Sequence, residues 1–278
     1  MVRLIQLELG LSERRACRAI GQPRSTQQYA RRRPPEYRDV VARLHELCCD
    51  QPRYGYRRLA VIMQSEGWHI STRRVAAICR EEGIHASLRN RAPKTLTNSS
   101  MRSATPSAVF CCDVLYDESV GGEPLAWIAV LDECTRECVA LTVQHRVQSA
   151  EVIAAWASIL EGEYSSGIPR TVRCDNSPLW GTKQVSEWVS RHGVEVRRTR
   201  RGAPWQNSIV ESFFARLRSE LLNHSEMADL AEARAEAALW QRLYNNVRPH
   251  SALGYQPPSR FRDKLLAEYA TREGSQSD

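Results

Sequence analysis

The sequence lacks any hydrophobic run long enough to cross a membrane. The longest apolar run near its centre covers residues 125–131, whereas a membrane-spanning helix needs about 20 apolar residues. The chain also lacks a positively charged start followed by a long apolar stretch, which is the pattern of a secretory signal. These absences predict a cytoplasmic protein with no membrane partner.

Metal-binding patterns built on cysteine and histidine are also missing. The nine cysteines are an odd number and include no Cys-x-x-Cys pair, which argues against a disulfide scaffold and against a zinc ribbon. The seven histidines are scattered without the spacing of metal ligands. We expect the pairs Cys48-Cys49 and Cys111-Cys112, which have apolar neighbours, to be small buried thiols in a reducing compartment.

Acidic residues are scarce in the first part of the chain. Residues 1–108 contain 20 lysines and arginines against 9 acids, a net charge of +11, whereas residues 109–278 contain 19 against 23. A basic segment before a mildly acidic one predicts a nucleic-acid-binding module followed by a core that uses metal ions. The alternative is a solvated basic surface with no such partner.

Helix-turn-helix patterning occurs twice within the basic part. Residues 11–21 read as a Ser-capped helix ended by Gly21, and a second short helix opens at Gln22, so this part is a small helix-turn-helix or a simple helical hairpin. Residues 31–35 follow as a basic, proline-stiffened linker.

A second helical unit follows that linker. Apolar residues at helical spacing predict helices around residues 40–48 and 59–63, and a third that begins at Ser71-Thr72. The outer face of the third helix carries Arg73, Arg74 and Arg80. A helix of this kind can enter a major groove while its arginines contact phosphates.

The rest of the chain alternates between strand and helix patterns. We expect strands at 108–116, 125–132, 137–144, 170–175 and 193–198, and helices at 149–161, 182–192, 207–222 and 225–246. Three consecutive strands followed by alternating helices and strands predict an α/β core, a mixed five-stranded sheet with helices on both faces. Asp117 and Glu118 read as turn residues after the first strand.

Three acids fall at informative places in this pattern. Asp113 lies within the first strand, Asp175 ends the fourth, and Glu211 lies on the helix that follows Asn207, the residue expected to cap it. Carboxylates are ligands for Mg²⁺, and two such ions can clamp the attacking and leaving oxygens of a phosphoryl transfer. A fourth acid, Asp132, reads instead as a hydrogen-bond acceptor in a structural turn.

These features resemble the insertion-sequence-three family of bacterial transposases, in particular the product of the second reading frame, whose core is shared with retroviral integrases. The motifs are Asn-Ser-Ile-Val-Glu-Ser-Phe-Phe at 207–214, Tyr-Asn-Asn-Val-Arg-Pro-His at 244–250 and Leu-Asp-Glu-Cys-Thr-Arg-Glu at 131–137. The resemblance covers residues 10–262. It implies a ribonuclease-H-like fold and assigns the metal ligands to Asp113, Asp175 and Glu211, with Arg218 as an accompanying basic residue.

Two positions depart from the family pattern. Phe110 stands where tryptophan is usual, and Ser177 stands where glycine usually follows Asp-Asn. Because glycine adopts positive φ without steric cost, a serine there predicts strain if the turn needs positive φ. Just before the Glu211 helix lies a basic group, expected to contact DNA phosphates: Arg197, Arg198, Arg200 and Arg201.

The resulting prediction is a DNA transposase that cuts and transfers strands with two Mg²⁺ ions, for which Mn²⁺ can substitute. Its partners would be the element's terminal repeats, target DNA, further copies of itself on DNA, and a first-frame product, either separate or fused by frameshifting. The alternatives are a non-catalytic regulator that binds DNA and a ribonuclease-H-like nuclease. The expected division is 1–35 helix-turn-helix-like segment and linker, 36–95 DNA-binding domain, 96–107 linker, 108–262 catalytic core and 263–278 polar tail.

Overall fold

The computed structural model describes residues 1–28, 36–84, 103, 105–161, 170–200 and 204–274. The chain divides into two compact units, Met1–Glu46 and Leu47–Asp278. The linkers expected at 31–35 and 96–107 lie wholly or mostly outside the described residues.

The first unit contains three short helices at the start of the chain. They are α1 (Val2–Leu9), α2 (Glu13–Ala19) and α3 (Arg24–Gln28). Helices α2 and α3 were expected, and Ser12 does lie at the N-cap position of α2, although its side chain makes no capping bond. Helix α1 was not predicted, although Val2 and Ile5 lie at helical spacing and pack against Ala16 and Cys17 of α2; its three leucines are exposed.

The expected second helical unit corresponds to α4 (Tyr37–Asp50), α5 (Tyr56–Ser65) and α6 (Thr72–Glu81). Helix α4 begins in the first unit and ends in the second, where α5 packs on α6. The hydroxyl of Ser71 accepts a hydrogen bond from the backbone N–H of Arg74 at 3.2 Å, so it caps α6 as the sequence predicts. The predicted apolar stripe of α6 is buried: Val75, Ile78 and Cys79.

A mixed five-stranded sheet forms the centre of the second unit. Its strands lie in the order β3-β2-β1-β4-β5. Strands β1 (Val109–Glu118), β2 (Pro124–Asp132) and β3 (Cys138–Gln144) are antiparallel neighbours, while β4 (Thr171–Cys174) and β5 (Glu195–Arg198) continue from β1 in parallel. The predicted sheet is therefore confirmed, and each strand is within a few residues of its expected bounds.

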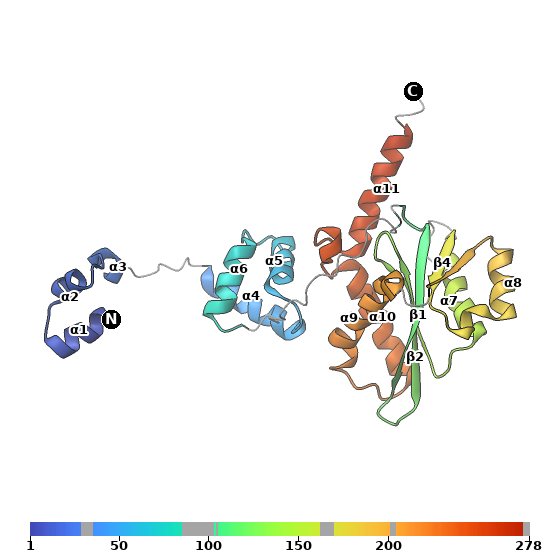
Figure 1. Cartoon of the computed structure of the whole chain (residues 1–278), viewed down its shortest axis with the longest axis horizontal. Coiled ribbons are helices and arrows are strands. Elements are labelled where there is room, and N and C mark those ends of the chain that lie inside the picture. Colours follow the sequence, from blue (N-terminus) through green and yellow to red (C-terminus); the bar gives the residue numbers. More distant parts are fainter. Residues whose placement is uncertain (29–35, 85–102, 104, 162–169, 201–203, 275–278) are drawn as a thin grey trace. The chain divides into compact units, whose positions relative to one another are not determined.

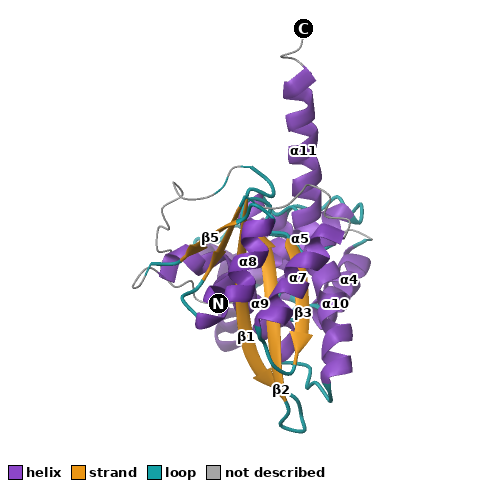
Figure 2. Cartoon of the chain, turned by 90° about the vertical axis from the view of Figure 1, so that its right-hand side faces the viewer, coloured by secondary structure: helices purple, strands orange, loops and turns teal. Residues whose placement is uncertain are grey.

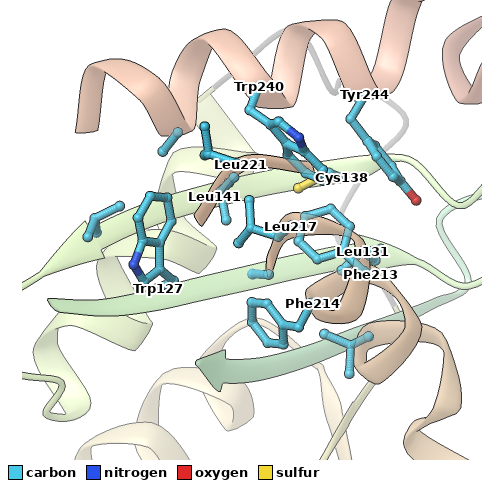
Figure 3. Close-up of a cluster of buried hydrophobic side chains, with 14 of the residues drawn as sticks. Trp127, Leu131, Cys138, Leu141, Phe213, Phe214, Leu217, Leu221, Trp240 and Tyr244 are labelled. Carbon is cyan, nitrogen blue, oxygen red and sulfur yellow. The ribbon is translucent and has the colours of Figure 1, made fainter. Parts of the chain in front are cut away.

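Helices cover both faces of this sheet (Figure 1). Helices α7 (Ser149–Glu161) and α8 (Lys183–Arg191) lie on one face, and α9 (Ser208–Leu217) and α10 (Leu230–Asn246) on the other. Successive side chains of a strand point to opposite faces, so Cys111 packs toward α9 and α10 while Cys112 packs toward α7 and α8. On the α9 side, Phe213 stacks edge-on against Trp240 and Tyr244 of α10 (Figure 3).

One prediction for the C-terminal part was wrong, and one helix there was not predicted. The long helix expected from residue 225 begins at Leu230, because Asp229 caps it through the backbone N–H of Glu232 at 2.9 Å. The expected polar tail from residue 263 is largely helical: α11 (Pro258–Gly274) extends beyond the core (Figure 2). Its polar residues leave no clear apolar face, so periodicity does not reveal it.

The cysteine prediction holds for one pair and fails in part for the other. Cys111 and Cys112 are fully buried, whereas Cys48 is half-buried and Cys49 is exposed on the outer side of α4. None of the helices in the described ranges is long and apolar enough to span a membrane.

Candidate active site

The first two acids lie on neighbouring parallel strands. Strands β1 and β4 pair in a register that sets Cys111 opposite Arg173. The same register carried two residues further sets Asp113 opposite Asp175, just beyond the last residue of β4. Alternation along β1 places Asp113 on the face that α9 covers. The fold therefore brings together two acids that are 62 positions apart in sequence.

The third acid reaches this place on α9. Glu211 lies in the first turn of that helix and is exposed, while its neighbours Val210, Phe213 and Phe214 are buried. The helix is fixed by this apolar face, and its exposed face brings the charge of Glu211 near Asp113 on the central strand β1.

Asn207 connects the same helix directly to Asp113. It occupies the N-cap position of α9, but the prediction that its side chain caps the helix was wrong. Its Nδ2 instead donates a hydrogen bond to Oδ2 of Asp113 at 2.9 Å. The other oxygen of Asp113, Oδ1, accepts from the backbone N–H of Val114 at 2.8 Å. Asn207 is 5% exposed, so this bond is made within the protein.

The pKa of Asp113 depends on the other two acids. The pKa of Asp113 is raised to about 6, first because the carboxyl is buried and then because the negative charges of Asp175 and Glu211 oppose its ionisation. The hydrogen bonds from Val114 and Asn207 act in the opposite direction. Such a raised pKa is expected where carboxylates converge without a counter-charge.

Asp175 is held by the turn that follows it. Its Oδ1 accepts hydrogen bonds from the backbone N–H of Ser177 at 3.1 Å and from the indole Nε1 of Trp180. The predicted strain at Ser177 is not present, because its φ is −57° and its ψ is 141°, an ordinary extended conformation. The Ser177 hydroxyl also accepts from Leu179 N–H at 3.3 Å, so serine suits this turn.

The donor set fits a hard divalent cation, because all three side chains supply carboxylate oxygens. In the part of the chain that the structure describes, no group of three or more His, Cys, Asp or Glu side chains is already arranged to hold a metal ion. The carboxylates are thus near enough to raise the pKa of Asp113 but are not gathered around a common point.

The rival acids play other parts. Asp132 is fully buried and accepts backbone hydrogen bonds from Ser107 and Cys134 at 2.7 Å and from Thr135 at 3.2 Å, so its predicted role as a structural acceptor is confirmed. Asp117 and Glu118 are exposed as expected, but they extend β1 instead of forming a turn.

Two kinds of known domain family match the chain. The integrase core domain family matches residues 103–204 and, in a second description under the same name, residues 192–258. An HTH-like domain family matches residues 36–92. The first two matches contain all three acids, and the third contains α4, α5 and α6.

Known proteins resemble the chain over nearly its whole length. An uncharacterized 31.7 kDa protein of insertion element IS407 from Burkholderia multivorans is 33% identical over 265 residues, which cover 95% of each chain. The transposase InsD for insertion element IS2D of Escherichia coli is 24% identical over 241 residues, covering 80% of this chain and 78% of that one. This chain belongs to the insertion-element transposases with an integrase core.

A solved structure supports the fold of this transposase. A simian T-cell lymphotropic virus intasome, determined by cryo-electron microscopy in complex with the PP2A regulatory subunit B56 gamma, matches with a TM-score of 0.50. The match has 13% sequence identity and covers 80% of this chain and 73% of that chain. The ribonuclease-H-like arrangement predicted from the sequence is therefore confirmed.

The arginines expected to contact DNA lie in three places in the transposase. On α6, Arg73 and Arg80 are exposed and Arg74 is half-buried. On α9's continuation, the π-helical turn η4 (Arg218–Leu222), Arg218 is exposed and reaches the backbone oxygen of Tyr116 at 3.4 Å.

The remaining arginines lie on β5, the edge strand of the sheet, and just after it. Arg197 is exposed and pairs with Glu195 at 2.9 Å, while Arg198 occupies the space beside Gly181 that a side chain there would need. Arg200 is exposed, and its backbone N–H donates to Gln206 at 2.8 Å. Arg201 lies outside the described residues.

This basic segment borders the turn after Asp175. The side chain of Asn176 donates to the backbone oxygen of Thr199 at 2.6 Å, which ties the turn to the residues that follow β5. The backbone around Thr199 therefore lies beside the turn after Asp175.

Sequence reasoning missed two side chains at the site. The bond from Asn207 to Asp113 spans 94 positions and is visible only in the fold. The bond from Trp180 to Asp175 spans five, and an indole donor close after a strand-ending acid is the signal that could have indicated it.

Proposed function

We propose that this transposase cuts and joins DNA strands in a metal-dependent reaction for which Asp113, Asp175 and Glu211 supply the metal ligands. The observation that carries the proposal is the placement of these acids: the β1–β4 register sets Asp113 opposite Asp175, and Asn207, at the start of the helix that carries Glu211, donates a hydrogen bond to Asp113. The charges of Asp175 and Glu211 also raise the pKa of Asp113, although burial is the larger cause. Asp113 lies on a strand, Asp175 in a turn and Glu211 on a helix, yet the charges of the last two act on the first. Acids that only cover a solvated surface would have no reason to come together from three different elements. Strands and helices also hold ligands more rigidly than loops do.

The chemistry would be that of a polynucleotidyl transferase. Two bound Mg²⁺ ions, or Mn²⁺ in their place, would supply Lewis-acid stabilisation of the attacking and leaving oxygens at the phosphorus. The part of Asp113 and Asp175 is to present carboxylate oxygens from adjacent strands, while Glu211 closes the set from α9. The same residues would serve first for cleavage at the element's ends and then for attack of the freed 3′-hydroxyl on target DNA.

DNA is the partner that the charge distribution supports. The exposed arginines of α6 would contact the terminal repeats, and those on and just after β5 would contact phosphates near the acids. Two element ends must be brought together for transfer, so we infer that at least two copies act on one DNA complex. Placement in the insertion-sequence-three family, with a first-frame product as a separate or fused partner, belongs to the same proposal.

The substitution Asp175→Asn tests the proposal. The variant should lose strand cleavage and strand transfer on terminal-repeat DNA while its affinity for that DNA stays close to that of the wild type. Because Mg²⁺ that binds only the folded protein stabilises it, the variant should also lose most of the Mg²⁺-induced rise in melting temperature. Its melting temperature without metal should not fall, since one negative charge is removed from a repelling set.

Two further acids serve as controls. Asp117→Asn removes an exposed charge from the same strand as Asp113 and should change neither activity nor the response to Mg²⁺. Asp132→Asn should lower stability by about 1–3 kcal/mol, because a buried acceptor of three backbone bonds is altered, yet keep the Mg²⁺ response. Full strand-transfer activity in Asp175→Asn would refute the assignment of the site.

A further inference from the structure

The tryptophan that follows Asp175 makes a bond that packing alone does not require. Trp180 lies in the 3₁₀ turn η2 (Pro178–Gly181) and is 3% exposed. Its indole Nε1 donates a hydrogen bond to Oδ1 of Asp175. A phenylalanine could fill the same apolar space, but only an indole places a donor against that carboxylate.

The ring of Trp180 is itself held firmly. It stacks on Trp156 of α7 with ring centroids 6.0 Å apart and an angle of 13° between the planes. Trp188 of α8 packs against Trp156 in turn, with centroids 5.4 Å apart. A donor whose ring is fixed by this stack restricts the carboxylate it binds, because the carboxylate cannot rotate without losing the bond.

The two oxygens of Asp175 are consequently unequal. Oδ1 accepts from both Trp180 and the backbone of Ser177. Among the residues that the structure describes, none donates a hydrogen bond to Oδ2. The carboxylate thus has one oxygen anchored to its own turn and one that is left to bind an ion.

We propose that Trp180 is a positioning residue for Asp175: its indole N–H anchors Oδ1 and so orients Oδ2 as the oxygen that binds the metal. This inference rests on the proposed function, since it assigns Asp175 as a metal ligand. Partners that fix a ligating side chain typically change metal affinity by about 10- to 100-fold when they are removed.

The substitution Trp180→Phe isolates the bond, because it keeps an aromatic ring against Trp156 and removes the N–H. The full chain would be titrated with Mg²⁺ alone while the melting temperature is followed, and strand transfer would be measured over the same range. We expect the Mg²⁺ concentration at half-maximal effect to rise by about 10-fold in both measurements. DNA affinity, measured without metal, should not change.

Trp156→Phe is the matched control. It removes an indole from the same stack, but the Nε1 of Trp156 donates no hydrogen bond to Asp113, Asp175 or Glu211. Both variants lose similar packing, so both should lose similar stability without metal, and only Trp180→Phe should shift the Mg²⁺ midpoint. Equal midpoints for the two variants would overturn the inference.

A measurement on the unaltered ring covers the case in which Trp180→Phe does not fold. NMR spectra of the wild type and of Asp175→Asn would be compared, both without metal. The chemical shift of the Trp180 indole N–H should differ between the two proteins, while that of the Trp156 indole N–H should differ little. An unmoved Trp180 resonance would also overturn the inference. If Asp175→Asn keeps the full Mg²⁺ response, the proposed function fails; if it loses that response and Trp180→Phe keeps it, only the role of Trp180 fails.

Discussion

The buried histidine of the C-terminal motif should make the stability of the transposase depend on pH. His250 is 7% exposed, and its Nδ1 has no hydrogen-bond partner within the described part of the chain. Burial first, and then the positive charge of nearby arginines, lowers the pKa of His250 to about 3. These arginines face it from α9, from α5, from the turn after β2 and from its own segment: Arg216, Arg58, Arg136 and Arg248.

The sign and size of the effect follow from linkage. In the unfolded chain the imidazole takes up a proton near pH 6.5, whereas in the folded protein it stays neutral until about pH 3. Stability from this residue is therefore complete above pH 6.5 and is lost as the pH falls. Between pH 8 and pH 5 the loss should be about 2 kcal/mol.

Urea denaturation at several pH values between 8 and 5 measures this loss. The free energy of unfolding of the wild type should fall more steeply than that of His250→Gln, and the difference between the two slopes isolates the imidazole from other groups. His69→Gln, at an exposed position of the same unit, controls for removal of a histidine. Equal losses in wild type and His250→Gln would show that the folded protein protonates His250 readily and would refute the reasoning.

Two further predictions concern the turn after Asp175 and the DNA-binding helix. Ser177→Gly should lower the free energy of unfolding by about 0.5–1 kcal/mol in urea, because the backbone is already relaxed and glycine adds entropy to the unfolded chain; greater stability would mean that the turn is strained after all. Replacing Arg73 and Arg74 together by Ala in the full chain should weaken binding to terminal-repeat DNA and reduce the slope of log affinity against log salt by about 2. The control Lys183→Ala, on α8, should leave that slope unchanged, and an unchanged slope in the arginine variant would remove α6 from the interface.

The sheet and the acids could be predicted because their signals are local. The strands of the sheet contain runs of apolar residues, and an acid within or directly after such a run stands out. Asp113 lies within β1, and Asp175 directly follows β4. Glu211 was found for a related reason, since the apolar spacing of α9 sets its exposed face. The resemblance to transposases then linked three signals that are far apart in sequence.

What the sequence did not reveal depends on contacts or on weak patterns. The side chain of Asn207 could accept a hydrogen bond from the first turn of α9 or donate one to a carboxylate. Only the fold shows that it donates to Asp113. Ser177 was expected to be strained by analogy with glycine, although its own φ is ordinary. Helix α11 has no apolar stripe that periodicity could detect, whereas α1 has one, in Val2 and Ile5, that was overlooked.

The C-terminal motif illustrates how a signature can matter without touching the chemistry. Arg248 is 2% exposed and binds both oxygens of Glu220, at 2.5 and 2.7 Å, on the π-helical turn that continues α9. Tyr244 packs edge-on against Phe213 of α9, with ring centroids 5.0 Å apart. Both contacts fix the buried side of α9 and its continuation, and the exposed side of α9 carries Glu211. A recognisable motif in this core therefore supports the position of an acid, and the distinction between support and chemistry comes from burial, which the sequence does not state.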